Sequence, residues 1–398
     1  MMNPTMFDPI ALDAWYSDEN NDSLLQTELE HYLQNYFSCF SQQPQRRLFQ
    51  TFIQGLLSPL ERKSIEPVAL HFSGEKYELL SRQIGAGCGM LSVDDTSFVK
   101  KGKHSAGVKR QYCGCLGKTE NCQSGVFLAC AGDKGYGLVD YELYIPKEWF
   151  SGDYSKLREE CHIPEEKTFA TKNQIAQRML NQVIKSGRFQ VQWVGCDAAY
   201  GNDHGFLDGL ELPEGVWYFA ATNAKEQVFL EYPQQSFPET KRGRPRKHPV
   251  LSNGPTSVRD IAEDPSLPWE TVVLAEGTKG PIIAERKFLR CFSCRADGSR
   301  NYVKPGDEIW LYLRKYAGDE IKYFVSNAPA DLPVGELDRA ATLRWPIEQC
   351  FEECKSNLGM GDYECRSYQG WNRHMLFVMI THLFATQIRE IFKKKQSR

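Results

Sequence analysis

The spacing of apolar residues divides the first part of the chain into helical and strand-like stretches. Between 24 and 85, apolar residues such as Leu25, Leu29 and Leu33 recur near a 3.6-residue period, which predicts helices. From 89 to 145, short runs rich in Val, Phe, Tyr and Leu are separated by Gly-containing turns, which predicts strands. We therefore expect a helical N-terminal domain followed by a sheet.

The middle of the chain alternates between the two patterns. A helical stretch at 173–186 precedes the apolar run 191–196 and the polar turn that follows it. Because a strand follows a helix here, the predicted fold class is α/β. From 213 to 333 the pattern is strand-like, and 230–270 holds seven of the 20 prolines, which indicates an open, poorly packed loop inside a mainly β insertion.

After 334 the pattern predicts three helices, at 336–343, 346–358 and 371–392. We expect the chain to comprise four segments: a helical 1–85, a first core segment 86–212, the β insertion 213–333 and a helical second core segment 334–398.

The composition is that of an ordinary globular protein, with 41% hydrophobic and 25% charged residues in 398. No run of about 18 apolar residues is present, and the first residues lack the pattern of a signal peptide, so we expect no membrane association and a cytoplasmic location. The 13 cysteines are scattered, and we expect most of them to be reduced thiols.

The charge distribution changes what the net charge of −3 implies. The first 45 residues carry seven acids and no Lys or Arg, so the remaining chain carries +4. Positive residues gather in two segments, which are candidates for DNA contact or, alternatively, solvated loops. They are Lys100, Lys101, Lys103, Lys109 and Arg110 in the first, and Lys241, Arg242, Arg244, Arg246 and Lys247 in the second. The Gly-Arg-Pro centre of the second resembles an AT-hook, which binds the minor groove.

Four carboxylates lie at the ends of apolar runs or on a predicted helix. Asp94 and Asp95 end one apolar run, which would place one of them at the carboxyl end of a strand. Asp197 ends a second apolar run, and Glu348 lies on the helix predicted at 346–358. Three converging carboxylates would hold two Mg²⁺ ions for attack on a phosphodiester, whereas isolated ones are solvated or cap helices. Residue types alone leave both interpretations open.

The segment RWPIEQCFEECK decides between them. Arg344, Glu348 and Lys355 match the R-x3-E-x6-K part of the Y-x2-R-x3-E-x6-K signature, and the chain resembles the insertion-sequence DDE transposases. The stretches at 93–129 and 194–203 are similar to the blocks around that family's two aspartates, with a weaker likeness at 46–69.

The resemblance implies an RNase H-like mixed sheet flanked by helices, with Asp94, Asp197 and Glu348 as catalytic ligands of two Mg²⁺ ions, for which Mn²⁺ would substitute. Asp94 is preferred to Asp95 because the family places its aspartate first in a D-[DE]-T pattern. Arg344 and Lys355 become phosphate contacts. The signature Tyr is replaced by Ala341, and its DNA contact would fall to Trp345 or Tyr363.

The activity implied is that of a bacterial, nucleoid-associated transposase, with the helical segment 1–85 as its N-terminal DNA-binding domain. It would bind double-stranded DNA at terminal inverted repeats, cleave the strands and join the 3′-OH ends to target DNA as a homodimer on paired ends, with a hairpin intermediate as a further hypothesis. Two alternatives stay open: an RNase H-like nuclease that does not join strands, and a DNA-binding descendant without catalysis.

Two pairs of closely spaced cysteines are candidates for metal binding, but their sequence context does not favour it. Cys291 and Cys294 have the spacing of half a zinc site, but no second pair follows at finger spacing. Cys113 and Cys115 would point to opposite sides of an extended strand, which is unsuited to shared ligation.

Overall fold

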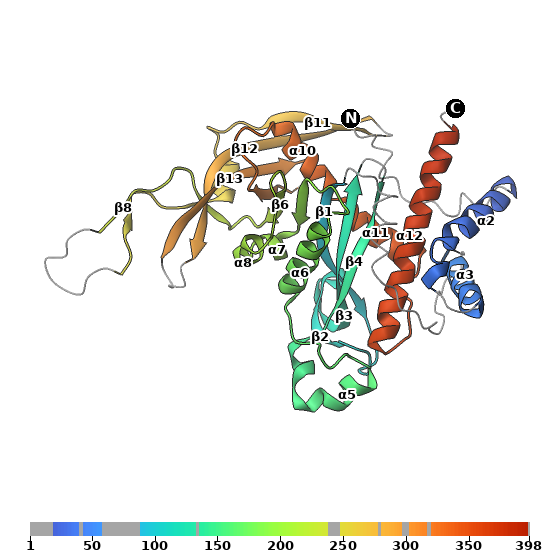
Figure 1. Ribbon diagram of the computed structural model, residues 1–398. Coiled ribbons are helices and arrows are strands. Elements are labelled where there is room, and N and C mark those ends of the chain that lie inside the picture. The colour runs from blue at the N-terminus through green and yellow to red at the C-terminus, as the bar shows by residue number, and fades with distance from the viewer. Residues whose placement is uncertain are drawn as a thin grey trace. The chain divides into compact units, whose positions relative to one another are not determined.

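The computed structural model describes residues 19–39, 43–57, 88–132, 135–237, 247–277, 280–296, 302–316 and 320–396 (Figure 1). These residues divide into two compact units, one from Gln192–Thr342 and the other from Thr5–Val191 together with Leu343–Arg398. We call them the insertion unit and the core unit. Each is described by itself.

The core unit contains an antiparallel sheet. Its strands are β1 (Cys88–Val99), β2 (Lys109–Cys113), β3 (Lys118–Gly132) and β4 (Gly135–Tyr144). The long strand β3 pairs with each of the other three. These strands confirm the prediction for 89–145, and the register of β1 against β3 places Asp94 opposite Phe127.

Helices cover both faces of this sheet. Asp95 of β1 pairs with Lys172 at the start of α6 (Lys172–Lys185), whereas the next residue, Thr96, meets Lys355 of α11 (Pro346–Asn357). Because successive side chains of a strand point to opposite faces, α6 and α11 lie on opposite faces. α6 begins with a capping box between Thr171 and Gln174, and its buried stripe includes Ile175, Met179 and Val183.

The long helix α12 (Tyr368–Gln396) packs on β4 and receives the two N-terminal helices, α2 (Glu19–Gln34) and α3 (Gln43–Leu57) (Figure 1). Tyr32 of α2 donates a hydrogen bond to the carbonyl of Ile380 at 2.9 Å. Phe49 of α3 lies 5.5 Å from Phe377, ring centre to ring centre. The N-terminal helices therefore share a core with α12.

Short elements complete the core unit: the 3₁₀ helices η2 (Phe37–Cys39), η3 (Gly114–Leu116), η4 (Lys147–Phe150) and η5 (Gly152–Tyr154), and helix α5 (Ser155–Glu160). In the described part of the chain, no helix is both long and apolar enough to cross a membrane.

The insertion unit is built on a mixed sheet. β5 (Trp193–Cys196) is parallel to β6 (Trp217–Thr222), and the strands that follow across the sheet, β14, β13 and β12, are antiparallel. Phe219 of β6 anchors its core, with ring centres 4.8 Å from Phe324 and 5.7 Å from Tyr312. With helices and a mixed sheet among the described residues, the predicted α/β class is confirmed.

The remaining elements of this unit surround that sheet. The strands are β7 (Gln227–Phe229), β8 (Gln235–Ser236), β9 (Val250–Leu251), β10 (Thr256–Ser257), β11 (Glu270–Gly277), β12 (Gly280–Ala296), β13 (Val303–Lys315) and β14 (Lys322–Ser326), and the helices are α7 (Ala198–Gly201), α8 (His204–Asp208), α9 (Val258–Glu263) and α10 (Val334–Leu343). β8 and β9 form a separate two-stranded ribbon (Figure 1).

The loop expected at 230–270 is better packed than predicted near its end. α9 buries Val258 and Ile261, and the buried amine of Lys287 donates to the carbonyls of Ala262 at 2.7 Å and Asp264 at 2.9 Å. A lysine that neutralises the carbonyl end of a helix stabilises it. The prolines alone therefore did not predict the packing of this segment, because Lys287, which holds the end of α9, lies on β12 outside the loop.

Candidate active site

Asp94 and Asp95 lie in the middle of β1, and the prediction that they end a strand is wrong. β1 continues to Val99 because Thr96, Ser97 and Phe98 keep alternating between the two faces of the sheet. The two carboxylates therefore point to opposite faces.

Asp95 is committed to a structural ion pair. Its Oδ2 accepts from Lys172 Nζ at 2.5 Å and from Ser124 Oγ at 3.0 Å. This pairing holds α6 to the sheet and gives Asp95 a role that does not involve catalysis. The choice of Asp94 over Asp95 as the catalytic residue stays a prediction.

Asp94 shares its face of the sheet with Thr96, two residues further on, and α11 packs on this strand. Lys355 of α11 donates from Nζ to Thr96 Oγ1 at 2.5 Å, so a predicted phosphate contact lies beside the strand position of Asp94. Asp94 Oδ1 accepts from the Asp95 amide at 2.7 Å. The contact between α11 and β1 thereby places Lys355 next to the strand that carries Asp94.

Asp197 directly follows β5, as predicted, but the residues after it form helix α7 and not an irregular turn. Asp197 is its N-cap: Oδ1 accepts from the amides of Ala199 at 2.9 Å and Tyr200 at 3.3 Å. The helix lies so close to β6 that a Cβ on Gly201 would meet the carbonyl oxygen of Ala221 at 2.0 Å. Asp197 is half-buried and held in a fixed orientation.

Glu348 lies at the solvent-exposed beginning of α11. Arg344, in the turn before the helix, donates from its guanidinium to Glu348 Oε1 at 2.8 Å, and the Glu348 side chain is 47% exposed. Trp345 between them is 43% exposed, a high value for so large an apolar side chain. The start of α11 thus presents an ion pair and one aromatic ring at the surface.

The position of the missing signature Tyr is buried. Ala341 is 2% exposed in α10, and its carbonyl accepts from Arg314 at 3.2 Å. Tyr363 is also buried, with its hydroxyl on Gln123 Oε1 at 2.9 Å, so it cannot replace the Tyr on a DNA surface. Of the two residues expected to replace the signature Tyr, Trp345 is the one that is exposed.

Glu353, five residues after Glu348, is 1% exposed and held by a buried polar network. Tyr136 donates to its Oε1 at 2.6 Å, Gln349 donates at 3.0 Å, and His382 lies 2.7 Å from Oε2. Burial by itself would raise the pKa of Glu353, but the hydrogen bond and charge of His382 lower it overall. This network ties α11 to α12 and β4.

The predicted basic segment at 100–110 divides into paired and exposed residues. Lys100 donates to the Tyr363 carbonyl at 3.0 Å and lies 3.4 Å from the centre of its ring, and burial lowers its pKa to about 8. Lys109 forms an ion pair with Glu148. Lys101, Lys103 and Arg110 are exposed.

In the second basic segment, Lys241, Arg242, Arg244 and Arg246 lie outside the described residues, and Lys247 is exposed.

Ten cysteines in the described residues are free thiols, whereas Cys130 is disulfide-bonded. Burial raises the pKa of Cys291 to about 12 and of Cys294 to about 11, which disfavours the thiolate that zinc requires. The prediction that Cys113 and Cys115 point apart is wrong. η3 turns the chain directly after β2, and the two Sγ atoms lie 3.2 Å apart.

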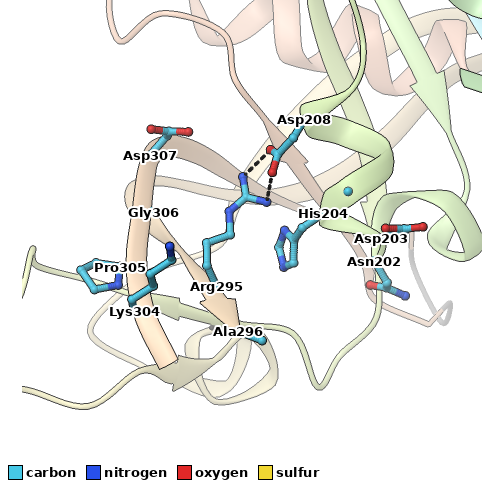
Figure 2. A pocket seen from close by; sticks show the side chains of 11 residues that line it. Asn202, Asp203, His204, Asp208, Arg295, Ala296, Lys304, Pro305, Gly306 and Asp307 are labelled. Carbon is cyan, nitrogen blue, oxygen red and sulfur yellow. Dashed lines mark hydrogen bonds and ion pairs between the residues drawn. The ribbon is translucent and has the colours of Figure 1, made fainter. Parts of the chain in front are cut away.

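The insertion unit contains an open cavity of about 780 Å³ between α8 and the adjoining ends of β12 and β13 (Figure 2). In its lining, Arg295 pairs with Asp208 at 2.9 Å, and His204 lies 3.4 Å from Glu226. Asp203 and Asp307 add negative charge. Sequence reasoning gave no signal for this cavity, because its lining joins residues about 90 positions apart.

The predicted catalytic carboxylates are divided between the units, with Asp94 and Glu348 in the core unit and Asp197 in the insertion unit. Within the described ranges, no three His, Cys, Asp or Glu side chains form a cluster that could hold a metal ion. The assignment of these three residues as a metal-binding triad stays a prediction.

Comparison with known proteins identifies the family. Residues 78–281, just over half of the chain, match the model of the DDE superfamily endonucleases, and the chain belongs to this family. The match spans the segments that carry Asp94 and Asp197 and confirms the resemblance drawn from the motifs. The family makes the chain a nuclease of the DDE type.

A solved structure that is similar to the chain is the piggyBac transposase synaptic complex with hairpin DNA, determined by cryo-electron microscopy. It shares 11% sequence identity, and the alignment covers 99% of this chain and 77% of that one with a TM-score of 0.39, so it adds nothing to the family match. No curated protein matches the chain.

Proposed function

We propose that this protein is a transposase that binds the terminal inverted repeats of its element, cleaves the DNA strands and joins the 3′-OH ends to target DNA. The observation that carries the proposal is the pairing of β1 with α11, in which Lys355 reaches Thr96 on the strand face of Asp94. Glu348 begins the same helix. A strand with a carboxylate, a helix with a carboxylate, and a lysine that reaches from the helix to the strand suit chemistry on a phosphate.

Asp94, Asp197 and Glu348 are the proposed ligands of two Mg²⁺ ions. Their carboxylate oxygens are the donors that Mg²⁺ prefers, and all three side chains are exposed or half-buried, so the ions would keep water ligands. When bound, the two ions would activate the attacking water or 3′-hydroxyl and stabilise the leaving oxygen.

The side chains around the carboxylates have separate roles in this proposal. Arg344 holds Glu348 in place in the free protein and turns to a phosphate oxygen when DNA binds. Lys355 supplies a second positive charge from the other end of α11. The exposed ring of Trp345 takes the DNA contact of the missing Tyr, by stacking on a base.

The wider DNA surface is proposed to include the exposed Lys101, Lys103 and Arg110 together with the basic segment 241–247. These residues would bind backbone phosphates, which position DNA without reading its sequence. Two DNA ends must be processed together, and we propose a homodimer on the paired ends.

The first experiment compares Asp94→Asn with Asp95→Asn in cleavage of a supercoiled plasmid that carries the DNA flanking both ends of the gene. Asp94→Asn should abolish cleavage and spare DNA binding. Asp95→Asn should cleave, because Asp95 serves the Lys172 ion pair. Cleavage by Asp94→Asn at the wild-type rate would overturn the proposal.

Strand joining separates the transposase from the alternatives. With precut ends and a target plasmid, the proposal expects joined products in Mg²⁺, whereas a nuclease gives none and a non-catalytic DNA-binding protein neither cuts nor joins. A hairpin on the cut end, visible on a denaturing gel, would add the hairpin step; unjoined open ends alone would remove it.

A further inference from the structure

A cluster of thiols lies beside the strand that carries Asp94. Cys113 ends β2, Cys115 lies in η3, and their Sγ atoms are 3.2 Å apart. Cys122 of β3 lies near Cys113, which contributes to the raised pKa of Cys122. Three thiols from one hairpin therefore meet at one place.

The members of the cluster differ in access. Cys115 is exposed, whereas Cys113 and Cys122 are both fully buried. An accessible thiol beside a protected one is the arrangement in which the first is oxidised and the second resolves it to a disulfide. The exposed thiol is the entry point, and the nearer buried thiol is its partner.

One member of the cluster also contacts β1, the strand that carries Asp94. Cys115 donates from Sγ to the carbonyl of Ser97 on β1 at 3.7 Å, and Ser97 follows Thr96, the partner of Lys355. Burial and the neighbouring Cys113 raise the pKa of Cys115, and the positive charge of Lys355 opposes this rise. Lys355 is therefore close enough to influence the thiol.

We propose that Cys113 and Cys115 are a redox-active dithiol that an oxidant of the peroxide or small-disulfide class converts to an intramolecular disulfide, and that this disulfide slows DNA cleavage. The second part rests on the proposed function. Each thiol loses its proton, one S–S bond forms, and the two electrons reduce the peroxide to two waters or the small disulfide to two thiols.

The geometry explains why the Cys113–Cys115 disulfide would be reversible and why it would change the structure near the proposed active site. The Sγ atoms must approach from 3.2 Å to about 2.05 Å across a single intervening residue, and a strained disulfide is readily reduced. The Cys115 thiol proton is consumed, so its hydrogen bond to the Ser97 carbonyl is lost and η3 must move. This disturbs β1 next to Thr96 and Lys355.

The disulfide can be detected without any activity measurement. Trypsin releases Gln111–Lys118, which holds Cys113 and Cys115 but no other cysteine. After treatment of the full chain with peroxide and alkylation of the remaining thiols, this peptide should be unalkylated and lighter by two hydrogens, and dithiothreitol should restore it. A peptide that stays alkylated, or one cross-linked through Cys122, would overturn the pairing.

Cleavage then tests the coupling. Oxidised wild type should cleave about tenfold more slowly, the effect expected from disturbing groups next to metal ligands, and recover on reduction. Cys115→Ser should cleave at an unchanged rate under both conditions, whereas Cys365→Ser should respond like wild type. A disulfide without slower cleavage overturns the coupling. An inactive reduced wild type instead contradicts the proposed function and leaves the peptide result standing.

Discussion

Two glutamates on α11 show how one helix can hold a structural and a chemical carboxylate five residues apart. Glu353 is buried and held by groups from β4, α11 and α12, while Glu348 is 47% exposed and held by Arg344 from the adjoining turn. Burial with several partners fixes the position of the helix. Exposure with one exchangeable partner leaves a carboxylate able to bind a new ligand, so surroundings and not residue type assign the roles.

The largest expected effect on stability comes from Glu353, the buried glutamate of α11. Glu353→Ala leaves His382 and Arg389 without their carboxylate in a site closed to water, and breaking such a pair costs about 3–5 kcal/mol of unfolding free energy. Chemical denaturation should show this loss, with Glu352→Ala, exposed and adjacent, close to wild type. Equal stabilities would mean that the network does not anchor α11.

The acid sensitivity of the core unit should come from His374, a buried histidine of α12. Burial lowers the pKa of His374 to about 4, so between about 6.5 and 4 the unfolded chain binds a proton that the folded chain does not. Stability should therefore fall as pH decreases through this window, by about 3 kcal/mol in full. His374→Gln should flatten the profile of unfolding free energy against pH, whereas exposed His104→Gln should leave it unchanged.

Glu353 should add to this loss at lower pH. Its folded pKa is lowered, so its stabilisation is complete above the ordinary glutamate value and disappears as pH falls through the folded pKa. A profile of Glu353→Gln that still falls as steeply as wild type below pH about 4.5 would contradict this assignment.

A smaller effect is expected on β1. Asp95→Asn removes the half-buried ion pair with Lys172 and should lower stability by about 1 kcal/mol. Asp94→Asn should lower it less, since Asp94 is not the partner of Lys172. A larger loss in Asp94→Asn would show that the two aspartates have exchanged roles.

The smallest stability change is expected at the exposed end of α11. Arg344→Ala should cost about 0.3–0.5 kcal/mol, because the Arg344–Glu348 pair is partly exposed. DNA affinity should fall nevertheless, and the slope of log affinity against log salt should decrease by about one. Lys156→Ala, at a side chain 87% exposed on α5, is the control. An unchanged slope in Arg344→Ala would remove the phosphate contact.

The sequence predicted the exposed carboxylate better than the buried one. The helix expected at 346–358 is present as Pro346–Asn357, and the spacing from Arg344 to Glu348 is enough to foresee their contact. Among the partners of Glu353, Tyr136 lies on β4 and His382 lies on α12, 29 residues further along the chain. No local sequence pattern predicts that these residues meet.

Local pattern failed wherever a chain reversal or a distant partner decided the structure. β1 extends past Asp94 because its pairing with β3 continues to Val99. The 3₁₀ turn at Gly114–Leu116 brings Cys113 and Cys115 together, against the expectation for an extended strand. The burial of Tyr363 depends on Gln123 and removes it from the DNA surface.

The claim that Glu348 of α11 is needed for catalysis is tested by plasmid cleavage in Mg²⁺ with the variants Glu348→Gln and Glu352→Gln. The two glutamates are both exposed and lie one helical turn apart. Both variants should unfold at the same denaturant concentration as wild type. We expect no cleavage by Glu348→Gln and wild-type cleavage by Glu352→Gln. Wild-type cleavage by a stably folded Glu348→Gln would contradict it.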